Sequence, residues 1–86
     1  MSPLPTIHLN GTSAKTLAED YSNARIAVHK AYEALQKVEF HSRDYLKPGE
    51  WQVALAAREE MFLTLSRISQ ELYRHEEHAS DSLVPY

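Results

Sequence analysis

The feature that most constrains this chain is a run of seven apolar and small residues spaced three and four positions apart. The run consists of Leu17, Tyr21, Ala24, Val28, Ala31, Leu35 and Val38. This spacing places all seven side chains along one stripe of a single α-helix. We therefore expect a helix over residues 13–41, with an apolar stripe that another helix must cover.

A second pattern of helical spacing occupies residues 50–78. Its apolar positions are Val53, Ala54, Ala57, Met61, Phe62, Leu65, Ile68 and Leu72. The intervening segment contains Pro48-Gly49, a pair that ends helices and forms turns. Two long helices joined by so short a turn must pack antiparallel. The sequence therefore predicts an all-α fold, an antiparallel two-helix hairpin over residues 13–78.

Both ends of the chain lack the helical pattern. Residues 1–12 contain two prolines and the alternation Ile7-His8-Leu9, so we expect a short extended N-terminal segment. Thr12 or Ser13 is a suitable N-cap for the helix that follows, because its hydroxyl can accept a free backbone N–H. Residues 79–86 lose the helical period, which predicts a flexible C-terminal tail.

The apolar stripes of both predicted helices are wider than one partner helix can cover. A chain of 86 residues buries only a modest part of its surface, and self-association would cover the remainder. We expect a homodimer of hairpins forming a four-helix bundle, or a larger ring of such dimers. The alternative is that Ile7 and Leu9 fold back over a monomeric hairpin, although two side chains cover little of it.

Composition argues against several classes of protein. Without cysteine, the chain has no disulfide, thiolate metal site or cysteine nucleophile. A net charge of −3 argues against binding polymeric nucleic acid. No apolar run approaches the ~20 residues of a membrane-spanning helix, and the N-terminus lacks the basic and apolar parts of a signal peptide. We therefore expect a cytoplasmic protein that does not bind membranes.

No sequence motif indicates an enzyme. A phosphate-binding glycine loop and a nucleophile–base motif are both missing, so we also expect no cofactor. His75-Glu76-Glu77-His78 places two histidines three positions apart on one helix face, where they could share a metal ion. A zinc site needs at least one further ligand, however. We favour a solvated helix end, where the helix dipole attracts cations, and predict no metal site.

Two polar stretches could contribute to a ligand site. The first precedes and opens the first helix, where free backbone N–H groups attract anions, and consists of His8, Asn10, Thr12 and Ser13. The second is Arg43-Asp44-Tyr45 in the turn. Arginine can bind phosphate, tyrosine can stack on a base, and aspartate can accept from a hydroxyl or amine. Helix capping and core packing are the alternative role for each stretch.

The two stretches lie at opposite ends of one hairpin, because a helix of about 28 residues spans some 40 Å. In an antiparallel dimer, the first stretch of one subunit meets the turn of the other. We therefore expect a composite pocket, formed twice per dimer, with Tyr21 and Arg25 along its wall.

The opening Thr6-Ile7-His8-Leu9-Asn10-Gly11-Thr12-Ser13, followed by Arg43-Asp44-Tyr45 between two alanine-rich helices, resembles a group of small helical-hairpin proteins of tailed phages and prophages. The turn in that group often reads Arg-Asp-Tyr-Tyr, and Leu46 stands here in place of the second tyrosine. In architecture alone, such a hairpin is also similar to the phage anti-CBASS and anti-Thoeris proteins, which sequester cyclic nucleotide signals between subunits.

The resemblance implies a non-enzymatic phage protein that acts in the host cytoplasm during infection. It would bind a cyclic oligonucleotide or a cyclic ADP-ribose in pockets between subunits and so counter host defence. The alternative hypothesis is a helical bundle that docks on a phage or host protein, its polar stretches serving as caps. A third hypothesis is a metal-dependent enzyme that uses His75 and His78.

Overall fold

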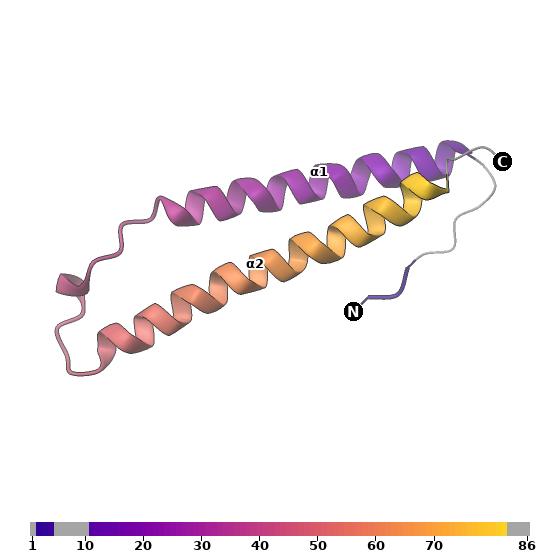
Figure 1. The fold of residues 1–86 in the computed structure, drawn as a ribbon. Coiled ribbons are helices and arrows are strands. Elements are labelled where there is room, and N and C mark those ends of the chain that lie inside the picture. Colours follow the sequence, from indigo (N-terminus) through magenta and orange to yellow (C-terminus); the bar gives the residue numbers. More distant parts are fainter. Residues whose placement is uncertain (1, 5–10, 83–86) are drawn as a thin grey trace.

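The computed structural model describes residues 2–4 and 11–82, except for the side chains of residues 11–13. It contains the long helices α1 (Gly11–Gln36) and α2 (Glu50–Asp81), with a short 3-10 helix, η1 (Ser42–Asp44), between them. The long helices run antiparallel and pack against each other along a hairpin of 62 × 22 × 15 Å (Figure 1). The predicted all-α hairpin is confirmed for this part of the chain, which has no strand.

Helix α1 lies closer to the N-terminus than the predicted 13–41. It begins at Gly11, so Thr12 and Ser13 belong to its first turn and not to the predicted N-cap position. At its other end the N–H groups of Lys37 and Val38 bond to carbonyls three residues back, at 3.1 and 3.2 Å, which tightens and ends the helix. Beyond this point Phe40 stacks on Trp51 in α2.

Helix α2 extends three residues beyond the predicted end at 78, to Asp81. Its last turn is packed, since Ala79 has no exposed surface. The Ser82 N–H then bonds to the carbonyls of His78 and Ala79 at 3.3 and 3.2 Å. Residues 79–81, predicted as part of a flexible tail, are thus helical because their apolar side is covered. The rest of that predicted tail, 83–86, lies outside the described residues.

The turn before α2 uses the predicted Pro48-Gly49 pair. Gly49 stands at the N-cap of α2 with φ 80°, a left-handed conformation that glycine adopts at little cost. The side chain of Glu50 reaches back and accepts a hydrogen bond from the Lys47 N–H at 3.1 Å. A backbone reversal and a local carboxylate contact therefore fix the start of α2.

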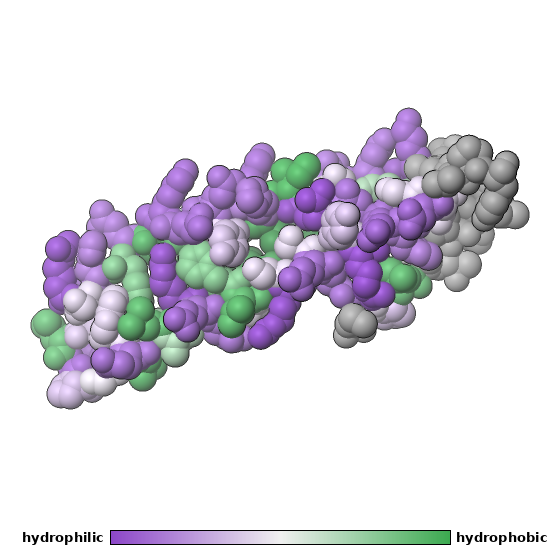
Figure 2. Space-filling view, in the orientation of Figure 1, coloured by the Kyte–Doolittle hydropathy of each residue, from purple (hydrophilic) through white to green (hydrophobic). Residues whose placement is uncertain are grey.

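The interface between the two helices is narrow. Among the side chains that the structure describes, only Ala14, His75 and Ala79 are buried, and no large side chain is fully buried. Leu17, Tyr21, Val28 and Leu35 of the predicted seam are half-buried, whereas Ala24, Ala31 and Val38 are exposed. Apolar groups are consequently scattered among polar ones over the visible face (Figure 2). One antiparallel partner covers only part of each stripe, in agreement with the predicted excess width.

The N-terminal residues that the structure describes lie against α2. Ser2 contacts Glu71, Arg74 and His75, so this segment folds back onto the hairpin. The alternative of a cover formed by Ile7 and Leu9 stays a prediction, because both residues lie outside the described residues. Within the described ranges, no helix has the length and apolar character needed to cross a membrane.

Candidate functional site

The predicted turn stretch lies at the tip of the hairpin. Arg43 and Asp44 belong to η1 and are exposed, and the half-buried Tyr45 follows them. Two backbone hydrogen bonds close this turn, from Asp44 N–H to the His41 carbonyl and from Tyr45 N–H to the Ser42 carbonyl, at 3.1 and 3.0 Å. The guanidinium of Arg43 has no partner in the part of the chain that the structure describes. It is therefore available to an anion.

Three aromatic rings gather beneath this turn. Phe40 stacks on Trp51 with centroids 4.6 Å apart, and Tyr45 lies 5.8 Å from Phe40 and 5.7 Å from Trp51. The guanidinium of Arg58 lies between Phe40 and Phe62, at 4.9 and 5.1 Å from the ring centroids. Tyr45 thus contributes to an aromatic cluster that anchors the loop, as the core-packing alternative supposed. The side chain of Tyr45 is only partly buried, so part of it remains accessible to a ligand.

Sequence reasoning missed Phe40, Trp51 and Arg58 as parts of the tip. The signal was the gathering of Phe40, Tyr45 and Trp51 within a dozen residues around a Pro-Gly turn. A groove of about 430 Å³ opens beside the cluster. It is lined by Leu35, Val38, Glu39, Phe40, Tyr45, Glu50, Val53, Ala54, Ala57, Arg58 and Met61. The groove combines apolar walls with two carboxylates and one guanidinium.

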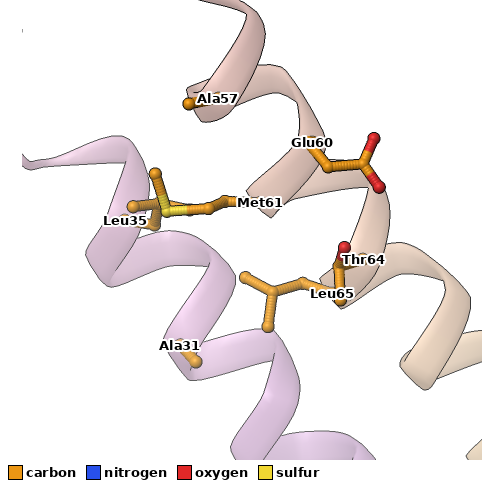
Figure 3. Close-up of a pocket in the computed structure, with 7 residues that line it drawn as sticks. All are labelled: Ala31, Leu35, Ala57, Glu60, Met61, Thr64 and Leu65. Carbon is orange, nitrogen blue, oxygen red and sulfur yellow. The ribbon is translucent and has the colours of Figure 1, made fainter. Parts of the chain in front are cut away.

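A second groove, of about 600 Å³, continues from the first toward the middle of the hairpin. It is lined by Ala31, Leu35, Ala57, Glu60, Met61, Thr64 and Leu65. Met61 reaches from α2 toward Leu35, and the carboxylate of Glu60 points away from α1 (Figure 3). Because its walls are almost entirely aliphatic, this groove suits an apolar surface and offers little to a charged ligand.

The predicted wall residues Tyr21 and Arg25 lie near the other end of the hairpin and contact α2. Tyr21 stacks on His75 with centroids 4.8 Å apart. Arg25 forms an ion pair with Glu76, with Nε 2.7 Å from Oε2, and this contact raises the pKa of the guanidinium. Within one chain both residues therefore join α1 to α2 and do not approach the turn.

The remaining predicted site residues belong to the N-terminal stretch. His8 and Asn10 lie outside the described residues, as do the side chains of Thr12 and Ser13. The structure does not bring the backbone of Thr12 and Ser13 near the turn stretch of the same hairpin. It places Arg43-Asp44-Tyr45 at the tip and the start of α1 at the opposite end (Figure 1), the separation that led to the expectation of a composite pocket.

His75 is buried, with 6% of its surface exposed, and not solvated as the sequence analysis favoured. Its Nε2 lies 2.6 Å from the Ser2 hydroxyl, whereas Nδ1 is buried and has no partner in the described structure. Glu71 lies 3.7 Å from the same Nε2. A catalytic triad would need the carboxylate at the other ring nitrogen, so this arrangement lacks triad geometry. In the described ranges no three His, Asp or Glu side chains form a metal-binding group.

Ser2 is held through its backbone and its side chain. Its N–H and its hydroxyl both donate to Glu71 Oε1, at 2.9 and 2.7 Å, and Arg74 donates to its carbonyl. Arg74 also donates to Glu71 at 2.7 Å. These hydrogen bonds, first that from Arg74, lower the pKa of Glu71 to about 2. These hydrogen bonds around Ser2 form a clasp, and the clasp depends on an ionised Glu71 carboxylate.

Comparison of the chain with models of known protein families, with curated proteins and with solved structures finds no match. The function must therefore be inferred from the residues and their arrangement.

Proposed function

We propose that this chain is a non-enzymatic phage protein that assembles with itself and binds a small nucleotide-like anion between subunits. In this proposal the ligand is a host immune signal, a cyclic oligonucleotide or a cyclic ADP-ribose, which the protein sequesters in the host cytoplasm. The phage origin and the ligand class rest on the sequence resemblance.

The observation that carries the proposal is the juxtaposition at the tip of the hairpin. Arg43 is exposed and unpaired within the described chain, and it stands two residues from Tyr45 in the aromatic cluster. A guanidinium binds phosphate in a forked geometry, and an aromatic ring can stack on a base. The groove of about 430 Å³ beside the cluster is within the size range of small-molecule sites.

Self-association is part of the proposal because one hairpin offers only an open site. Large apolar side chains remain exposed on both helices, including Met61 at 49% and Ile26 at 46%. Exposed apolar residues in such number favour association, which removes them from water. A second hairpin would also supply another wall for the tip groove.

A melting assay with a panel of cyclic oligonucleotides and cyclic ADP-ribose isomers tests this function. A ligand present at a hundred times its Kd should stabilise the protein by about 2.7 kcal/mol. Arg43→Ala should abolish that shift and leave the oligomer intact, and Arg43→Lys should weaken it, because lysine lacks the fork. Lys30→Ala, which removes an exposed cation from the middle of α1, is the control. A normal shift with Arg43→Ala would rule out this site.

One observation favours a second function, a bundle that docks on a phage or host protein. Leu46 is 87% exposed and Val53 is 71% exposed, and both lie near the tip. Side chains so exposed can serve as anchors in a protein interface. An intact oligomer that responds to no member of the nucleotide panel would favour this alternative.

A further inference from the structure

We infer that two copies of this hairpin pair antiparallel through one defined face, with a two-fold axis between Leu63 and Thr64 of α2. The inference rests on the self-association proposed above. It adds the face, the register and the residues that meet across the axis.

The face consists of two exposed stripes, one on each helix. They lie on either side of the groove of about 600 Å³ in the middle of the hairpin, the central groove. On α1 the stripe is Ala24, Ala27, Ala31 and Ala34. On α2 it is Val53, Ala57, Met61, Thr64 and Ile68. Steps of three and four residues keep each stripe on one side of its helix. The central groove has walls from both stripes, at Ala31 and at Met61 (Figure 3), so they border the same opening.

The charges beside the α2 stripe fit a second copy of the same chain. Glu60 and Arg67 are exposed, carry opposite charges and lie seven residues apart on one side of α2, with Oε1 and NH1 3.2 Å from each other. An axis between Leu63 and Thr64 lies midway between them. Antiparallel pairing about this axis brings Glu60 of each copy to Arg67 of the other, so that two equivalent ion pairs form.

The residues of α1 that are level with this axis can also pair with their copies across it. Because the helices are antiparallel, the ring contacts Tyr32–Phe62 and Tyr21–His75, with centroids 4.9 and 4.8 Å apart, place the axis level with residues 30–33 of α1. Ala31 lies at that level and Ala27 and Ala34 flank it, so these three residues of both copies lie close to the axis. Small side chains therefore meet where the two α1 helices face each other, which permits an interaxial distance near the short end of about 8–10 Å.

The register has a consequence for the ligand site. It relates Trp51, on which Tyr45 of the turn packs, to Glu76 of the second copy, which forms an ion pair with Arg25. The turn of one subunit would then lie beside the start of α1 of the other, as a composite pocket requires. Pairing through the apolar stripes would in this way also assemble the ligand site at the tip.

A mixing experiment with two charge variants tests the face. The Glu60→Arg chain carries arginine at positions 60 and 67, and the Arg67→Glu chain carries glutamate at both positions. Each variant therefore loses the ion pair between these two positions within its own chain. Across the axis each variant alone places like charges together, and its dimerisation should weaken about tenfold. The mixture places arginine opposite glutamate at both points and should form a heterodimer, seen by sedimentation and by native mass spectrometry. A mixture that stays as weak as its components would contradict the pairing.

Single cysteines test the register, because the chain has no cysteine of its own. Thr64→Cys lies next to the axis, where two copies can reach disulfide distance, and oxidation should link most of the protein as dimers. Val53→Cys is the control: in this register it faces Arg74 of the second copy and should remain unlinked. A dimeric wild type in which Val53→Cys links and Thr64→Cys does not would overturn the register alone. A monomeric wild type would refute the self-association on which it rests.

Discussion

The imidazole of His75 stacks on the ring of Tyr21, with centroids 4.8 Å apart and planes 22° apart, and joins the C-terminal part of α2 to the N-terminal part of α1. The buried residues Ala14 and Ala79 lie toward the same end. The hairpin is therefore packed most closely at the end where α1 begins and α2 ends. Its middle, by contrast, carries the open aliphatic groove.

We expect the Tyr21–His75 stack to be measurable in a double-mutant cycle. Tyr21→Ala and His75→Ala should each lower the free energy of unfolding, and the double variant should lose less than their sum. The coupling should be about 0.5–1.5 kcal/mol, the usual range for stacked rings. Urea unfolding of the four proteins gives the value. His29→Ala, which removes a side chain that is 72% exposed, should change stability little. Additive losses would mean that the rings do not stabilise each other.

The clasp around Ser2 predicts a dependence of stability on acid pH. The pKa of Glu71 is lowered to about 2 from an ordinary value of 4.5. The folded protein therefore keeps this carboxylate ionised where the unfolded chain binds a proton. Its contribution is fully present above about pH 4.5 and is lost as the pH falls toward about 2.

Glu71→Gln should consequently flatten the fall in unfolding free energy within that window. Urea unfolding at several pH values provides the measurement. Glu59→Gln, at an exposed position on the same helix, is the matched control and should retain the acid profile of the wild type. An unchanged slope in Glu71→Gln would show that the clasp does not hold this carboxylate.

The position of Arg58 between two rings gives a third prediction. Arg58→Ala removes two cation–π contacts, to Phe40 and Phe62, and should cost about 1–2 kcal/mol at this half-exposed site. Arg58→Lys should recover part of the loss, because lysine keeps the charge and lacks the flat guanidinium. Trp51, the single tryptophan, stacks on Phe40, so its fluorescence should report loosening of the tip. Unaltered fluorescence and stability in Arg58→Ala would contradict this anchoring role.

The sequence was sufficient to predict the hairpin because the signals for it are local. Periodic apolar positions define each helix, and Pro48-Gly49 marks the reversal. The ends of the helices depend on distant residues and were not predictable in the same way. Helix α1 stops early where Phe40 begins to pack on Trp51, and α2 continues while Ala79 remains covered.

The site was only partly predictable for the same reason. A polar residue in a turn is usually exposed, and this placed Arg43 and Asp44 correctly at the surface. His75 has the same polar character but is buried, because Tyr21 and Ser2 cover it from far along the chain. Likewise, no local pattern indicated that Arg25 would pair with Glu76.

The turn itself provides the last prediction. Gly49 has φ 80°, and a Cβ added there would meet no atom within 4 Å. Gly49→Ala should therefore destabilise the hairpin through backbone strain alone, by about 1–2 kcal/mol, since an L residue disfavours this conformation. D-alanine at the same position adds the same methyl group but favours positive φ. A synthetic chain that contains it should be at least as stable as the wild type, because the unfolded chain loses freedom. Thermal unfolding of the three proteins separates the two effects. Equal losses with both enantiomers would mean that the methyl group clashes and that conformational strain is not the cause.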